Sequence, residues 1–96
     1  MSLLPVRSRT LHYFSSVKEA CADDVMEGLK AEYGTERQYK KSNFVDHLLN
    51  LEANGLLDET RCDVDKNGEL RVFYKLNDEG VNTINKYLPK KWHLNK

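Results

Sequence analysis

Polar side chains that can contact a nucleic acid are concentrated between residues 37 and 50. The candidates are Arg37, Tyr39, Lys40, Lys41, Asn43, His47 and Asn50. Asparagine donates and accepts hydrogen bonds in a geometry that matches the edge of adenine, so Asn43 and Asn50 are candidate base contacts, with His47 between them. Tyrosine, lysine and arginine at the start of such a segment contact phosphates and fix its position on a duplex.

A helix must position these side chains. Apolar residues at helical spacing predict its buried side, which comprises Phe44, Val45, Leu48, Leu49 and Leu51. If the helix begins near Lys40, its opposite side turns the candidate residues from Tyr39 to Asn50 outward, together with Asp46, which would repel phosphate. Ser42 or a neighbouring residue is expected to cap the start, and Gly55 to end the helix.

A hairpin follows this helix and supplies three further candidate cations, Arg61, Lys66 and Arg71. Residues 59–64 and 69–76 are predicted strands, and the Asn67-Gly68 pair between them predicts a type I′ turn. Asn77 is then expected to cap a last helix, whose buried stripe contains Val81 and Ile84 and which Pro89 ends.

The first third of the chain is predicted to be helical, but its division is open. Leu11, Phe14 and Val17 recur every three residues and predict a short first helix. Ser16 and Glu19 match a capping box, so a helix could instead start at Val17, and residues 10–33 could form one helix or two. The second part of this region is expected to end at Gly34, while residues 1–9 are expected to be flexible and residues 89–96 to form a basic tail.

Several classes of function find no support in the sequence. The 15 basic and 15 acidic side chains give zero net charge, which counts against a non-specific nucleic-acid coat. No apolar run is long enough to span a membrane, and no catalytic motif occurs. Cys21 and Cys62 are too far apart to predict a zinc site, and both are expected to be reduced and half-buried. We therefore expect a cytoplasmic protein that is not an enzyme and uses no metal or cofactor.

The sequence also contains part of a calcium-binding motif, but the motif is incomplete. Asp63-x-Asp65-x-Asn67-Gly68 matches the first half of an EF-hand loop, but Tyr74 occupies the position that needs a bidentate glutamate. A β-turn is the better interpretation of this segment.

Two strings resemble the winged-helix regulators of the MarR and PadR type. They are Val45-x-x-Leu48-x-x-Leu51-Glu52-x-x-Gly55-Leu56-Leu57 and Arg71-Val72-Phe73-Tyr74-Lys75-Leu76-Asn77-Asp78-Glu79-Gly80. The resemblance covers roughly residues 20–88. It implies an α+β, mostly helical fold, namely a winged helix-turn-helix with a three-helix core, a two-stranded wing and a C-terminal helix, and we expect this domain to span residues 10–88. It also implies sequence-specific binding of duplex DNA by a homodimer that regulates transcription as a repressor. Neither the operator nor any small-molecule or protein effector follows from the sequence.

Two alternatives remain at this point. The neutral net charge and the acidic pair Asp23-Asp24 favour a winged helix used as a protein–protein interaction module, such as a subunit adaptor or a plasmid or phage accessory factor. A replication or plasmid-control protein that also binds DNA is the other.

Overall fold

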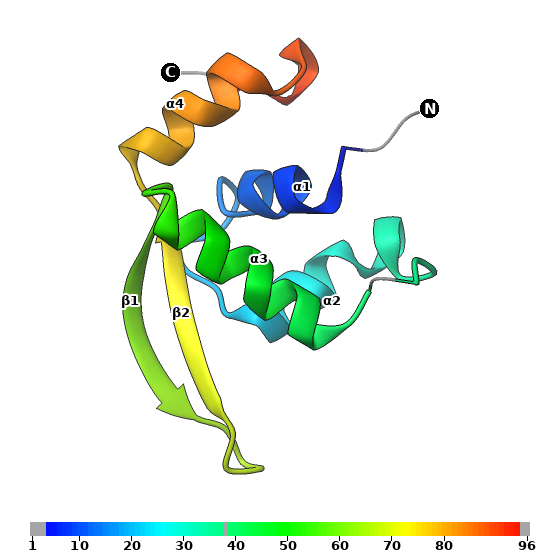
Figure 1. Ribbon diagram of the computed structural model, residues 1–96, viewed down its shortest axis with the longest axis vertical. Coiled ribbons are helices and arrows are strands. Elements are labelled where there is room, and N and C mark those ends of the chain that lie inside the picture. Colours follow the sequence, from blue (N-terminus) through cyan, green and yellow to red (C-terminus); the bar gives the residue numbers. More distant parts are fainter. Residues whose placement is uncertain (1–3, 38, 95–96) are drawn as a thin grey trace.

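The computed structural model describes residues 4–37 and 39–94. Its elements are α1 (Val6–Tyr13), α2 (Ala22–Tyr33), α3 (Lys41–Ala53), β1 (Leu57–Val64), β2 (Leu70–Leu76), α4 (Asp78–Tyr87) and the 3₁₀ turn η1 (Lys90–Trp92). The first three helices lie together beside a long hairpin that extends away from them, and α4 lies at the opposite end (Figure 1). The predicted α+β, mostly helical architecture is confirmed.

One core joins the helices to the hairpin. Phe14 follows α1, Val25 and Leu29 come from α2, and Phe44 and Leu48 come from α3; each is at most 2% exposed. Leu57 and Tyr74 extend this core into the hairpin, and Ile84 extends it into α4. Each of these elements thus contributes apolar side chains to a single core.

The segment between α1 and α2 pairs with β2 through an isolated β-bridge at Ala20. Ala20 and Tyr74 exchange two backbone hydrogen bonds, of 3.0 and 2.9 Å, so this segment runs antiparallel to β2. Residues 10–33 therefore form two helices. The capping box predicted at Ser16 and Glu19 does not start a helix, because Glu19 instead accepts hydrogen bonds from Thr60 and Arg61. Asp24 caps α2 by accepting from the Cys21 amide at 3.1 Å.

Both ends of the described chain pack on the domain. Val6 to Arg9 belong to α1, whereas the sequence predicts a flexible segment over residues 1–9; Pro5 is the residue directly before this helix. In the predicted basic tail, the Trp92 ring meets His12 edge-on, with 4.9 Å between ring centroids. Residues 1–3, 95 and 96 lie outside the described part.

The end of α3 agrees with the sequence, and its start differs. Gly55 has φ +80°, and Leu56 N–H donates to the Leu51 carbonyl while Gly55 N–H donates to Glu52, the two bonds of a Schellman cap. At the start, Lys40 is the N-cap residue, and Ser42 lies inside the helix. By contrast, Gly34 ends α2 with φ −59°, so it does not use the left-handed region.

The hairpin turn is not the predicted type I′. Among the described residues only glycines have positive φ, so Asn67 cannot occupy a type I′ centre, while Gly68 has φ +81°. The Asp65 carboxylate accepts from the amides of Asn67 and Glu69 at 2.8 and 3.0 Å. These bonds favour a type I turn followed by a glycine bulge, which is the usual three-residue hairpin loop.

The rotation of α3 about its own axis can be tested by replacing each of two adjacent leucines with alanine in turn. Leu48 is 2% exposed and Leu49 is 51% exposed. We expect Leu48→Ala to lower the free energy of unfolding by about 2–5 kcal/mol, because it leaves a cavity. Leu49→Ala should lower it by less than about 1 kcal/mol. Urea unfolding followed by circular dichroism measures both, and equal losses would contradict the assigned rotation.

Candidate nucleic-acid interface

The exposed side of α3 is more apolar than the sequence predicts. Phe44, Leu48 and Leu51 are buried, whereas Val45 and Leu49 are 39% and 51% exposed, although both were expected inside. The neighbouring helices cover a narrower stripe than the apolar residues occupy. The exposed side consists of Ser42, Val45, Asp46, Leu49, Asn50 and Ala53.

A shallow groove separates α3 from the hairpin. Val45 and Leu49 line it from α3, and Leu70 and Val72 line it from β2. Leu70 is 64% exposed, so its side chain remains available to a bound molecule. Lys41 bridges the groove's end, with Nζ 3.3 Å from Asp23 and 3.4 Å from Glu69, and these bonds raise the pKa of Lys41. This bridge holds the start of β2 beside α3.

The three predicted base contacts do not share one face. Asn50 is exposed on the outer side of α3. Asn43 and His47 are half-buried on the side that faces α1, where they line a hollow with Pro5 and Arg7. Because Asn43 and His47 are four residues apart, both follow the same flank of the helix.

Tyr39 points into the protein and does not belong to the outward set. Its hydroxyl donates to the Met26 carbonyl, and its ring packs edge-on against Phe44, 5.4 Å between centroids. Burial raises the pKa of the Tyr39 hydroxyl. Tyr39 was expected to face outward and contact phosphate, but its side chain faces inward and supports the turn before α3.

Exposed cations remain at the start of α3. Arg37 and Lys40 are exposed, and Lys40 occupies the N-cap position. Within the described chain, no side chain caps α3 and its first turn holds no acid. An uncapped helix N-terminus favours an anion, since its amides and dipole are directed at the ligand.

The hairpin cations are mostly neutralised by acids. Arg71 pairs with Asp63 through two bonds of 2.8 and 3.0 Å, and Arg61 binds Glu19 at 2.7 Å and Asp63 at 3.2 Å. The hydrogen bond from Thr60, followed by that from Arg61, lowers the pKa of Glu19, and the bonds from Arg71, followed by Arg61, lower the pKa of Asp63. The Arg61 guanidinium lies 3.8 Å above the ring centre of Phe73 and helps to cover that ring.

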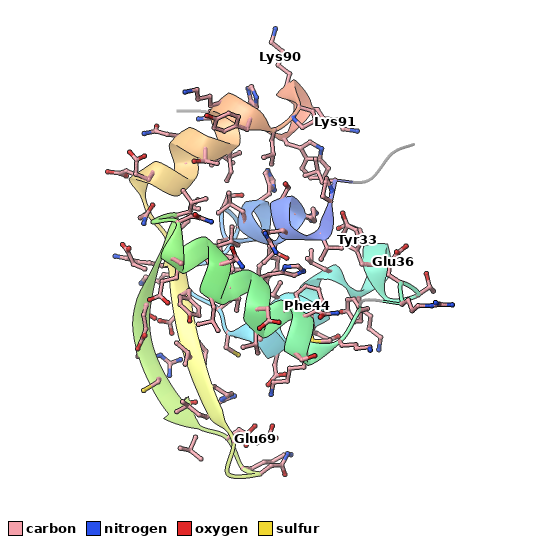
Figure 2. All side chains as sticks on the ribbon, in the orientation of Figure 1. Tyr33, Glu36, Phe44, Glu69, Lys90 and Lys91 are labelled. Atoms are coloured by element: carbon pink, nitrogen blue, oxygen red, sulfur yellow. The ribbon has the colours of Figure 1, made fainter. Side chains whose placement is uncertain are left out.

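The other charged side chains are distributed along the length of the molecule. Of the three hairpin cations, Lys66 is exposed in the turn. Glu69 lies near the end of the hairpin, while Lys90 and Lys91 lie at the opposite end of the molecule (Figure 2). Lys90 and Lys91 therefore lie far from the hairpin turn.

Comparison of the structure with solved structures identifies the fold. No family model and no curated protein matches the sequence. Among the solved structures that match, three share 15–20% sequence identity with this chain. A PadR-like transcriptional regulator of Bacillus cereus has a TM-score of 0.60, over 81% of this chain and 72% of that one. Bacillus subtilis PadR, solved with operator DNA, has a TM-score of 0.63, over 96% of this chain and 51% of that one. The fold is a winged helix. A zinc-responsive MarR-family member of Lactococcus lactis shares it, with a TM-score of 0.59 over 85% of this chain and 49% of that one.

Within the winged helix, α2 and α3 form the helix-turn-helix and β1 and β2 form the wing. The chain spans about half the length of the MarR-family member and of Bacillus subtilis PadR, at 49% and 51%. In the described part of the chain, no helix could cross a membrane, and no three metal-binding side chains lie together. Cys21 is buried and Cys62 is exposed, so the two thiols do not share the half-buried environment that was expected.

Two histidines couple stability to pH. Burial lowers the pKa of His47, and the nearby Arg7, whose Nε donates to His47 Nδ1 at 3.3 Å, lowers it further. Burial, then Arg9, lowers the pKa of His12. As pH falls below the unfolded value of about 6.5, the unfolded chain binds these protons first. The stabilisation is therefore present above that pH and is lost as pH falls through the folded pKa.

We expect the free energy of unfolding to be smaller at pH 5.5 than at pH 7.5. Replacing both rings with neutral amides, His12→Gln and His47→Gln together, should flatten this dependence, because neither amide titrates. Urea unfolding at both pH values measures the slope. An unchanged slope in the double variant would assign the pH dependence to other groups.

Proposed function

We propose that this domain binds duplex DNA sequence-specifically through α3 and the wing, and that it acts as a homodimeric cytoplasmic repressor of transcription rather than as an enzyme. The main support is geometric: the exposed side of α3 stands beside a projecting hairpin, with Arg37 and Lys40 at its start. A winged helix alignable with 96% of this chain, Bacillus subtilis PadR, has been solved with operator DNA.

The proposal assigns separate roles to the exposed groups. A B-DNA major groove admits one helix, and α3 can enter it only with the face opposite Phe44 and Leu48. Lys40, Arg37, the α3 N-terminus and Lys66 would contact phosphates. Asn50 would contact a base, and Asn43 and His47 remain candidate contacts at the α1-facing edge of the helix.

The ion pairs predict that duplex affinity depends only moderately on salt concentration. Lys41, Arg61 and Arg71 are held by acids, so Arg37, Lys40 and Lys66 are the cations proposed to meet phosphate. Each phosphate contact contributes about −0.9 to the slope of log affinity against log salt. Three contacts per protomer therefore imply a slope of about −3 for each protomer.

A protein-interaction module is the second candidate. The exposed Val45, Leu49 and Leu70 suit an apolar partner surface, and the net charge is zero. The two functions differ in salt dependence, because apolar docking does not weaken as salt rises whereas phosphate binding does.

Lys40→Ala tests the phosphate role. We expect weaker binding to all duplex sequences alike and a salt slope reduced by about 1, because one phosphate contact is lost. Fluorescence polarisation of a labelled random-sequence duplex across a salt series, with the solution mass measured in parallel, gives both values. Lys86→Ala, an exposed lysine on α4, is the matched control and should behave as the parent. Salt-insensitive behaviour of a monomer would favour the protein-interaction function.

Asp63→Asn tests the opposite effect. Removing this carboxylate frees Arg71 and part of Arg61, so we expect tighter duplex binding and a steeper salt slope. Asp78→Asn makes the same change of charge at the start of α4 and serves as the control in the same polarisation assay. Equal effects of the two variants would mean that total charge, and not the hairpin pairing, governs binding.

A further inference from the structure

The exposed side of α3 lacks the chemistry that recognises guanine. From Ser42 to Ala53 the helix contains no arginine and no lysine. Bidentate arginine or lysine contacts to guanine are the commonest specific contacts in the major groove. Lys41, the one cation inside α3, is turned to Asp23 and Glu69. A duplex bound on this face would therefore be recognised through other groups.

The groups that α3 does expose match the A·T pair. Val45 and Leu49, one helical turn apart, form an apolar strip that Leu70 continues onto β2. Thymine is the base that presents a methyl group in the major groove, where apolar side chains contact it. Asn50 is exposed on the same side of the helix and can form the bidentate contact with adenine.

We propose that Val45, Leu49 and Leu70 contact the C5-methyl groups of pyrimidines in the major groove, so that the domain prefers A·T pairs. The inference rests on the proposed function. It assigns a specificity role to apolar side chains that the sequence places in the core, and it makes the groove between α3 and β2 part of the DNA-contacting surface.

The surroundings of the strip favour DNA over an apolar protein partner. Lys40 and the uncapped N-terminus of α3 lie at one end, and Lys66 lies in the turn beyond Leu70. Phosphates flanking a major groove would meet these groups while the strip faces the base edges.

The Lys41 bridge positions the second half of the strip. By binding Asp23 on α2 and Glu69 beside Leu70, Lys41 keeps the wing next to α3. Val45 and Leu70 line the same groove as a result. The strip is thus continuous across two elements.

Uracil substitution measures the contribution of the methyl group directly. Random-sequence duplex pools are prepared with thymine or with uracil, and with cytosine or 5-methylcytosine, and each is titrated by fluorescence polarisation at low salt. Burying one methyl group changes affinity by about fourfold. We expect the uracil pool to bind at least about fourfold more weakly than the thymine pool, and the 5-methylcytosine pool to bind more tightly than its parent.

Two variants locate the effect. Leu49→Ala should bring the thymine-to-uracil affinity ratio towards one, because it removes part of the surface that the methyl group contacts. Tyr87→Ala, which truncates an exposed aromatic ring on α4, should keep the ratio of the parent. Salt-sensitive binding with equal affinity for the thymine and uracil pools would overturn this inference and leave the proposed function standing. No binding to any pool would overturn both.

Discussion

The burial of one side of α3 determines the rest of the interface. Phe44, Leu48 and Leu51 are each at most 4% exposed, which fixes the rotation of the helix about its axis. That rotation turns Val45 and Leu49 toward the hairpin and Asn50 toward solvent. It also directs Lys41 to Asp23 and Glu69, which hold the wing in place. A core contact thus decides which side chains a bound duplex could meet.

Local patterns predicted the elements well, since their causes are local. The two strands of the hairpin, the glycine at position 55 and the cap at Asn77, whose side chain accepts from Gly80 N–H, all depend on residues a few positions apart. The exposure of Val45 and Leu49 depends instead on how much of α3 its neighbours cover, which periodicity does not specify. The inward direction of Tyr39 likewise depends on Met26, far along the chain.

The pairing of the hairpin arginines with acids follows only partly from the sequence. Asp63 and Arg71 are cross-strand partners, so their pairing follows once the hairpin register is known. Glu19 reaches Arg61 because the segment before α2 pairs with β2, and that tertiary contact has no local signal. Acids therefore occupy both hairpin arginines, Arg61 and Arg71, which suits the proposed specific rather than purely electrostatic mode of binding.

The most direct test of the account maps the bound surface residue by residue. A ¹⁵N-labelled chain is titrated with a random-sequence duplex at low salt, and the amide signals are followed by NMR. The account predicts that the largest changes occur along the exposed side of α3, at Ser42, Asp46 and Asn50, and at Lys66 in the hairpin turn. Changes confined to α4 and η1, or no changes at all, would contradict it.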